Sequence, residues 1–446
     1  MRPMSEPNND LLKRLFELLA IPSISSGGGD PADLERAAAW LAAEIERAGG
    51  EARVITDHGN PLVAGWLRCG RPGARRVLIY GHYDVQSPDP VDAWRFPPFE
   101  PTVADGRLWA RGASDDKGNF YPLLYVACEL AAKGELPFDV RVLVEGEEEV
   151  GSENIVDHIR NREEPADVAL IFDSLMADAD TPALTVGTRG IVATEIKVRT
   201  GERNLHSGLY GNVALNAVHV LEDMLAAVRP GPDGRLRPEL RAGVAPPSET
   251  ERAAWAQLKP GAEALAEVGA RPATPDAAEL FYERTVADAT LDIAGIWGGD
   301  ALQRRTIIPV EAQAQVNLRL APGQDAFELA RVLEGLLRAA AHPLADVEIV
   351  SYGVAQPALF EPSHPVLQLA AEAITQAAGR SPVFIRLGGT LPIMAALAER
   401  AIPTVLTGYA LPEDNIHAPN ESFSLRSLAL CERTARALFE RLGALP

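Results

Sequence analysis

The sequence has few cysteines, no long apolar run and a deficit of basic residues. Its three cysteines, Cys69, Cys128 and Cys431, lie far apart and form no CxxC pair, which argues against a disulfide framework and favours a reduced, cytoplasmic compartment. No apolar stretch reaches the roughly 18 residues of a membrane-spanning helix, and residues 1–10 lack the apolar core of a targeting segment. We therefore expect no membrane partner.

Acidic side chains outnumber basic ones. The chain has 62 Asp and Glu residues against 42 Lys and Arg, which gives a formal net charge of −20. A surface of this sign repels phosphate backbones, so nucleic acid is not expected as a partner. The 446 residues, 47% of them hydrophobic and 23% charged, have the composition of an ordinary globular protein. This length allows about two or three domains.

Strands and helices alternate in the first part of the chain. Apolar residues recur at helical spacing over residues 10–20, with Asp10 as the expected N-cap. The nearly continuous apolar run at residues 76–80 is typical of a strand buried on both faces. Further strands are expected at residues 140–144 and 168–172. The pattern predicts an α/β domain built on a mixed sheet with helices on both faces.

A different pattern begins after these strands. Residues 187–199 alternate between polar and apolar, which is typical of an antiparallel strand with one wet face. The expected elements that follow resemble a βαββαβ sandwich, interrupted by a Pro-, Gly- and charge-rich excursion at residues 230–275 whose role the sequence does not reveal. We predict one α/β domain from residues 1–185 and 356–446, with an inserted α+β domain at residues 186–355.

Histidine and acidic residues follow successive expected strands. His82 and Asp84 come just after the strand at residues 76–80, where His82 can offer one ring nitrogen to a metal while Asp84 holds the other. Clustered carboxylates follow the next two strands, at residues 145–149 and at Asp173. Because like charges at one sheet edge are costly unless a cation neutralises them, the pattern favours a metal site.

Each of these features also has a plainer explanation when taken alone. An isolated HxD is more often a hydrogen-bonded loop histidine, and Asp115 and Asp116 before a helix could simply cap its N-terminus. A second loop histidine, His417, follows a strand near the end of the sequence. Two histidines with several carboxylates suit a pair of zinc or manganese ions, so the set is stronger than any member.

Several motifs, in their order along the chain, resemble those of a known family. The motifs are Gly81-His82-Tyr83-Asp84-Val85-Gln86, Ala113-Ser114-Asp115-Asp116-Lys117-Gly118 and Leu205-His206-Ser207-Gly208. They are similar to the dinuclear zinc peptidases that include carboxypeptidase G, aminoacylase and carnosine dipeptidase, and most similar to the cytosolic dipeptidase and carnosinase branch. The resemblance spans nearly the whole chain.

This resemblance implies roles for individual residues. The implied metal ligands are His82 and Asp173 for one ion, Glu149 and His417 for the other, and Asp115 for both. Glu148 would be the general base, and the Asp115-Asp116 peptide would be cis. The run of three glutamates leaves the register of base and ligand open, and the family's spacing before Gly151-Ser152 assigns them to Glu148 and Glu149.

The same resemblance implies that the inserted domain is a lid and that the other domain is catalytic. His206 would approach the substrate carbonyl from the partner subunit of a homodimer formed through the lid. Arg319 would pair with the substrate carboxylate, unless it is an ordinary outward strand residue. Gly389 and Thr390 would contact the substrate, unless residues 388–390 form a plain turn before a helix.

The implied activity is metal-dependent hydrolysis of the amide bond in dipeptides or short peptides with a free C-terminal carboxylate. A metal-bridged hydroxide would attack the amide and Glu148 would move the proton. The alternative is an N-acyl or N-carbamoyl amino acid amidohydrolase of the same family, which the sequence barely separates. A binding protein with a decayed metal site is disfavoured because every ligand position is filled, and a serine hydrolase because no GxSxG elbow is present.

Overall fold

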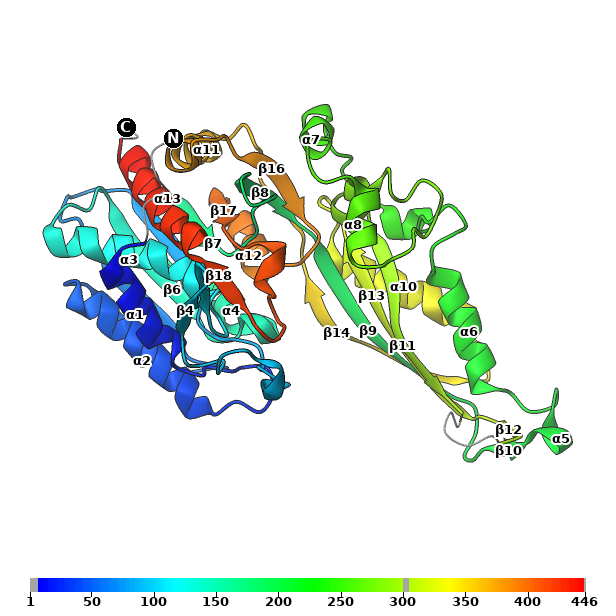
Figure 1. Cartoon of the computed structure of the whole chain (residues 1–446). Coiled ribbons are helices and arrows are strands. Elements are labelled where there is room, and N and C mark those ends of the chain that lie inside the picture. Colours follow the sequence, from blue (N-terminus) through cyan, green and yellow to red (C-terminus); the bar gives the residue numbers. More distant parts are fainter. Residues whose placement is uncertain (1–6, 300–304, 445–446) are drawn as a thin grey trace. The chain divides into compact units, whose positions relative to one another are not determined.

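The computed structural model describes residues 7–299 and 305–444, and the chain divides into two units. Unit 1 comprises Met1–Val186, Phe360–Ile385 and Ala396–Pro446, and unit 2 comprises Gly187–Leu359 and Arg386–Ala395. Figure 1 shows the course of the chain through the elements named below. Residues 1–6, which belong to the stretch expected to lack a targeting segment, lie outside the described part.

A mixed sheet forms the centre of unit 1. Seven of its nine strands, in sheet order, are β1 (Glu51–Ile55), β2 (Leu62–Leu67), β6 (Asp139–Glu145), β3 (Arg76–His82), β7 (Val168–Phe172), β17 (Thr404–Gly408) and β8 (Ala183–Thr188). Strands β6, β3, β7 and β17 are parallel, whereas β2 and β8 flank them in the antiparallel sense. The carboxyl ends of the four parallel strands therefore meet at one edge of the sheet, where sites of α/β proteins are built.

Helices bury this sheet. The longer helices of unit 1 are α1 (Asn9–Leu19), α2 (Pro31–Arg47), α3 (Lys117–Lys133), α4 (Glu153–Asn161), α11 (Pro365–Ala378) and α13 (Leu425–Gly443). All residues of β7 are buried, so both faces of the sheet are covered. The predicted mixed α/β fold is confirmed. The predicted N-cap of the first helix is wrong, because Asn8 rather than Asp10 caps it, and its side chain accepts a hydrogen bond from the Asp10 amide.

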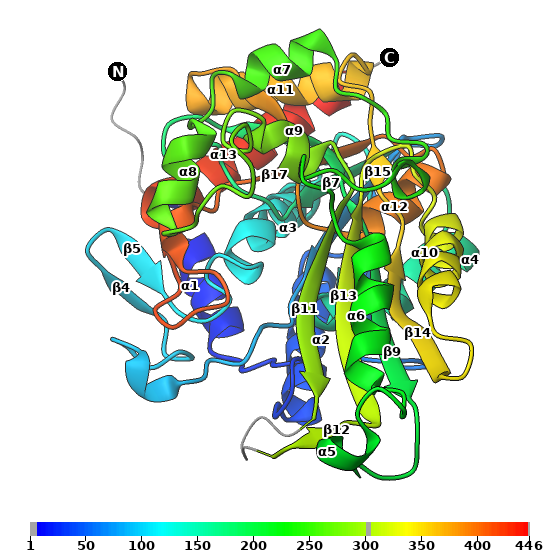
Figure 2. The same cartoon turned by 90° about the vertical axis from the view of Figure 1, so that its right-hand side faces the viewer.

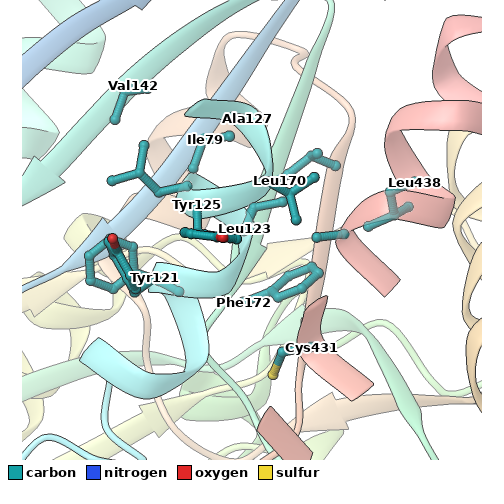
Figure 3. Close-up of a cluster of buried hydrophobic side chains, with 14 of the residues drawn as sticks. Ile79, Tyr121, Leu123, Tyr125, Ala127, Val142, Leu170, Phe172, Cys431 and Leu438 are labelled. Carbon is teal, nitrogen blue, oxygen red and sulfur yellow. The ribbon is translucent and has the colours of Figure 1, made fainter. Parts of the chain in front are cut away.

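One core of unit 1 lies between α3, the sheet and α13. Figure 3 shows Leu123 of α3 among Ile79 of β3, Phe172 of β7 and Leu438 of α13, and all four side chains are buried. Burying an apolar side chain of this size stabilises the fold by roughly 1.5–3 kcal/mol. This packing holds the carboxyl ends of β3 and β7 in fixed positions.

A small sheet joins two distant segments of unit 1. It has the order β18 (Ser422–Ser424), β5 (Arg107–Trp109) and β4 (Thr102–Ala104), with antiparallel pairing throughout. Ser422 pairs with Trp109 and Ser424 with Arg107. The pairing aligns the residues just after β5 with those just before β18.

Unit 2 contains a four-stranded antiparallel sheet. Its order is β11 (Thr290–Gly298), β13 (Glu311–Leu320), β9 (Gly190–Arg199) and β14 (Asp346–Ala355). Helices α6 (Ala217–Val228) and α10 (Ala326–Ala340) pack against each other and on the same face of the sheet (Figure 2). Along the chain these elements follow the predicted βαββαβ order.

The remaining elements are short. The predicted excursion at residues 230–275 contains α7 (Glu249–Trp255) and α8 (Gly261–Glu267), and α9 (Phe281–Val286) follows it. The others are β10 (Leu205–His206), α5 (Ser207–Tyr210), β12 (Ile307–Ile308), β15 (Ala358–Leu359), β16 (Val383–Leu387) and α12 (Pro392–Glu399), with 3₁₀ turns at Val91–Ala93, Glu148–Val150, Pro238–Arg241 and Pro412–Asp414. Within residues 7–299 and 305–444, no helix is both long enough and apolar enough to cross a membrane.

Candidate metal centre

The carboxyl ends of the parallel strands carry the expected ligands of unit 1. His82 is the last residue of β3, and Asp173 directly follows β7. Glu148 and Glu149 lie in the 3₁₀ turn after β6. His417 lies in the loop after β17. Because these strands run in the same direction, their carboxyl ends place all of these side chains at one edge of the sheet.

Six side chains at this edge form two groups. The groups are His82 with Asp116 and Asp173, and Asp115 with Glu149 and His417, and within each group the ligand atoms lie within 4.8 Å of one another. Asp115 connects the groups, since its Oδ1 is 3.1 Å from His82 Nε2 and its Oδ2 is 3.0 Å from His417 Nε2. His417 Nε2 also lies 3.1 Å from Glu149 Oε2. The structure thus brings together all five residues expected to bind metal.

The acids of the centre suit a cation. Burial raises the pKa of Asp116 and of Glu148, and it raises that of Asp173 to about 7, with further contributions from neighbouring carboxylates in each case. Among the described side chains, Asp116 Oδ1 is buried and has no hydrogen-bond partner. A divalent cation would relieve both the desolvation and the mutual repulsion, and imidazole with carboxylate is the donor set that zinc and manganese accept.

The pKa values of the two imidazoles are also raised, which for a histidine favours the charged form. Burial lowers the pKa of His82, but hydrogen bonds with Asp115 and Asp84 outweigh it and hold that pKa well above its ordinary value. Hydrogen bonds with Asp115 and Glu149 raise the pKa of His417 to about 10. A metal ion binds the neutral imidazole, so metal binding at this site would release protons.

Asp84 supports the centre from behind. Its carboxylate accepts hydrogen bonds from Ser25 Oγ at 2.6 Å and from the amides of Glu148 at 3.2 Å and Glu149 at 3.1 Å. His82 Nδ1 lies 3.1 Å from the main-chain oxygen of Asp84 and 3.4 Å from its Oδ1. The second ring nitrogen of His82 therefore faces Asp84 as expected, with the shorter contact to the main chain.

Two residues at the centre, Asp116 and Glu421, are not among the metal ligands expected from the sequence. Asp116 was weighed there as a helix cap, but its side chain makes no capping hydrogen bond and lies with His82 and Asp173. The peptide between Asp115 and Asp116 is cis, as the resemblance implied. Glu421 is completely buried and accepts a hydrogen bond from the Asp115 amide at 3.0 Å. The signal for Glu421 was its place shortly after a candidate histidine ligand.

The expected substrate residues lie in unit 2. Arg319 Nη1 donates a hydrogen bond to Thr390 Oγ1 at 2.9 Å, so these two predicted residues meet. Arg189, which the sequence reasoning missed, donates from Nε to the Gly388 oxygen and from its amide to the Gly389 oxygen, both at 3.0 Å. Arg189 thus holds the backbone of the segment that carries Thr390.

Asp292 is the acidic residue whose charge acts on both arginines, and Asp288 also acts on Arg189. Burial and the nearby Arg319 lower the pKa of Arg189 to about 10. Among the described residues, no carboxylate forms an ion pair with either guanidinium. Such a pair of arginines, one buried and one half-buried, suits an anionic group from outside the chain.

His206, at the end of β10, is exposed, and its Nδ1 accepts a hydrogen bond from the Gly208 amide at 3.0 Å.

Imidazole and carboxylate side chains at the carboxyl ends of parallel strands, together with a separate α+β unit, are typical of a metal-dependent hydrolase. The chain belongs to peptidase family M20/M25/M40, whose family model matches residues 78–441. It is therefore a metallopeptidase, and the resemblance drawn from the motifs is confirmed.

Three proteins similar to this chain are named as peptidases. The cysteinylglycine-S-conjugate dipeptidase of Corynebacterium striatum is 28% identical over 93% of this chain and 92% of its own length. The probable di- and tripeptidase DUG2 of Saccharomyces cerevisiae is 26% identical over 98% of this chain, which spans about half (51%) of that protein's length. The M20 family metallo-carboxypeptidase Sso-CP2 of Sulfolobus solfataricus has a similar structure, with a TM-score of 0.88 at 26% identity over 98% of this chain and 100% of that chain.

Proposed function

We propose that this metallopeptidase hydrolyses the amide bond of dipeptides or short peptides that carry a free C-terminal carboxylate. The observation that carries the proposal is the position of Asp115, whose two carboxylate oxygens contact the imidazoles of His82 and His417. A single carboxylate in contact with both ligand groups suits a pair of closely spaced metal ions, as found in two-metal hydrolytic sites. The names of the relatives support dipeptides as the substrate class.

Two divalent metal ions would complete the centre, and zinc is the ion we propose, with manganese as the alternative. Their ligands would be His82 and Asp173 for one, Glu149 and His417 for the other, and Asp115 for both. When bound, the ions lower the pKa of a water molecule and polarise the scissile carbonyl. The chemistry of the donor set supports zinc, because it mixes nitrogen and oxygen ligands.

Glu148 would move the proton. Burial and the neighbouring Asp173 and Asp115 raise its pKa, which makes its carboxylate a stronger base than an exposed glutamate. It would accept a proton from the attacking water at a carboxylate oxygen and then deliver that proton to the leaving nitrogen. Asp84 fixes the amide of Glu148 and so orients this side chain.

Unit 2 would recognise the substrate. Arg319 would pair with the C-terminal carboxylate, and its bond to Thr390 pre-orients the guanidinium. Gly389 would leave room for the peptide backbone, with Arg189 holding this segment in place. His206 would donate a hydrogen bond to the carbonyl oxygen of a substrate bound in the partner subunit.

A homodimer formed through unit 2 belongs to this proposal. Strand β11 is an edge of the four-stranded sheet, and its Ile296 and Trp297 are 57% and 50% exposed. Apolar side chains on an edge strand with free backbone groups favour pairing with another chain. We also propose a reduced, cytoplasmic setting, supported by three cysteines that are all unpaired.

The experiment that tests the proposed activity is hydrolysis of dipeptides and N-acyl amino acids by chelator-stripped protein, before and after zinc or manganese is added. Cleavage of dipeptides that returns with metal supports the proposal. Cleavage of N-acyl or N-carbamoyl amino acids alone keeps the site but replaces the substrate class. No cleavage of either class by protein with two bound ions contradicts the proposed substrates.

A mixing experiment tests the dimer. The Glu148→Gln and His206→Ala variants should each be inactive, and a mixture should regain activity because the heterodimer contains one complete site. No recovery after verified subunit exchange contradicts action of His206 across the dimer. Sedimentation of the wild-type protein supplies the oligomeric state independently.

A further inference from the structure

We propose that Glu421 is a positioning residue that sets the spacing between Asp115 and His417 and thereby the metal affinity of the group Asp115, Glu149 and His417. The inference rests on the proposed dinuclear centre and extends it to a residue that does not itself touch a metal ion. It concerns unit 1 alone.

The carboxylate of Glu421 is bound on both oxygens by the segment that carries Asp115. Its Oε2 accepts hydrogen bonds from Arg111 Nη1 at 2.8 Å and from the Gly112 amide at 2.9 Å. Its Oε1 accepts from the amides of Ser114 at 2.8 Å and Asp115 at 3.0 Å. One buried side chain therefore fixes the main chain immediately before and at the bridging ligand.

Strand pairing explains why Glu421 reaches this segment. Strand β18 begins one residue after Glu421, and its first residue, Ser422, pairs with Trp109 at the end of β5. The ladder continues with a hydrogen bond of 3.3 Å from the Ala110 amide to the Glu421 main-chain oxygen. The register thus places Glu421 beside the residues that lead to Asp115.

The other end of the His417 loop is attached to the same segment. Asp414 Oδ2 accepts a hydrogen bond from Ser114 Oγ at 3.0 Å, and Asp414 also forms an ion pair with Arg107. Arg111 Nη2 donates to the Ala418 oxygen at 3.3 Å, next to the histidine. Both ends of the loop that carries His417 are therefore anchored to the segment that carries Asp115.

The backbone of His417 needs this anchoring. Its φ of 61° lies in the left-handed region, which is unfavourable for a residue with a side chain. The imidazole is half exposed, so packing alone does not hold it. Fixing the flanks of the loop is what keeps His417 Nε2 near Asp115 and Glu149.

A buried ion pair such as that of Arg111 and Glu421 also has a purely structural interpretation. Removing one partner of a buried pair destabilises a protein wherever the pair lies. A positioning role predicts something more, namely a change in metal affinity, because partners behind the ligands typically alter affinity by roughly 10–100-fold. The two interpretations are therefore separated by metal titration.

The test is titration of metal-free wild-type protein and of Glu421→Gln with Zn²⁺, followed by calorimetry, and with Co²⁺, followed by its visible spectrum. Glutamine has one acceptor oxygen, so one pair of N–H donors would face an NH₂ group. We expect two ions to bind the wild type. We expect Glu421→Gln to bind one ion nearly as tightly and the other roughly 10–100-fold more weakly, with an altered cobalt spectrum. Excess zinc should restore its dipeptide hydrolysis.

Glu163→Gln is the matched control. Glu163 is also buried in unit 1, accepts hydrogen bonds from Arg141 Nε and Nη2, both at 2.7 Å, and lies 2.9 Å from His158 Nε2. None of its partners is a proposed ligand. This variant should lose thermal stability while both metal affinities stay at the wild-type values.

Two outcomes would overturn the inference, and they differ in what they mean. If the wild type binds two ions and Glu421→Gln binds both with unchanged affinity, Glu421 is only structural and the proposed function stands. If the wild type does not bind two ions, the dinuclear centre itself is refuted. Should Glu421→Gln fail to fold, Glu421→Asp keeps the charge but is one methylene shorter, and it must weaken the second ion severalfold, since unchanged affinity there overturns the inference.

Discussion

Two sets of buried carboxylates in unit 1 differ in what neutralises them. Glu163 lies in a complete ion pair with Arg141, and although burial opposes its charge, hydrogen bonds from Arg141 and His158 lower its pKa to about 2. In the metal centre, burial raises the pKa of Asp173 to about 7 and raises that of Asp116 as well. The chain supplies its own cation where a carboxylate is structural, and it leaves carboxylates without an arginine or lysine partner, among the described residues, where a metal belongs.

Unit 2 contains two arginines that form no ion pair with a carboxylate among the described residues. Arg189 and Arg319 lie near each other, and their described partners are main-chain oxygens and the hydroxyls of Thr290 and Thr390. Among the described residues, the carboxylates of the unit 1 site thus have no arginine or lysine as ion-pair partner, and the two guanidinium groups of unit 2 have no carboxylate as ion-pair partner. A metal ion would complete the first and a substrate carboxylate the second.

The largest expected effect belongs to Glu148→Gln. The amide keeps the size of the side chain but cannot accept and return the proton, so turnover should fall by roughly 10²–10⁴-fold or more. Both metal ions should remain, because Glu148 is not one of the proposed ligands. Steady-state hydrolysis and metal analysis of the same sample measure the two quantities. Turnover close to that of the wild type would refute the role of Glu148 as base.

Glu163→Gln, in contrast to Glu148→Gln, should lose stability and keep its turnover. Loss of the negative charge leaves Arg141 buried without its ion-pair partner, and we expect a loss of about 3 kcal/mol in the free energy of unfolding. Metal content and turnover of the folded variant should match the wild type. Urea unfolding and metal analysis test this. A loss of metal without a loss of stability would remove the distinction between the two sets of carboxylates.

The stabilisation from Glu163 should depend on pH in a defined direction. Its folded-state pKa of about 2 lies below the ordinary value of 4.5, so its contribution is fully present above pH 4.5 and is lost as the pH falls toward 2. The difference in urea stability between the wild type and Glu163→Gln should therefore narrow when measured at pH 6, 4.5, 3.5 and 3. A difference that stays constant over this range would contradict the assignment of the stabilisation to this ion pair.

The smallest expected effect is that of Asp173→Asn on stability, which should be opposite in sign without metal and with metal. In metal-free protein, Asp173→Asn removes one of several charges that repel one another, and the variant should be more stable than the wild type by about 1 kcal/mol. With saturating zinc the order should reverse, because the variant has lost a ligand. Thermal unfolding with chelator and with zinc measures both. The same order under both conditions would show that repulsion does not dominate this site.

The sequence predicts the mixed α/β fold, and it also predicts which side chains lie together at the edge of the sheet. The strands of the parallel sheet are short apolar runs, and His82 and Asp173 stand directly at their ends, so local pattern and sheet geometry together predict where these side chains lie. The order of elements in unit 2 could also be predicted, because segments with the apolar spacing of strands alternate along the chain with segments that have the apolar spacing of helices. These features depend on neighbours in sequence or on rules that hold for all parallel sheets.

Contacts between distant segments could not be predicted in this way. The bond from Asp115 to Glu421 depends on the pairing of β5 with β18, and the bonds from Arg189 to Gly388 and Gly389 join residues about 200 positions apart. The N-cap error has a local cause, because Asn8 and Asp10 are both good capping residues and the choice depends on where the chain enters the helix.

The pairing of β5 with β18 joins two segments that the ribosome synthesises at different times. Asp115 and Glu421 are 306 residues apart, and a ribosome that adds about 5–20 residues per second needs roughly 15–60 s to travel from one to the other. For most of that interval the nascent chain contains His82, Asp115 and Asp173, whereas His417 and Glu421 are made only at its end. The group of Asp115, Glu149 and His417 is therefore complete only after His417 has been synthesised, later than β17 of the central sheet.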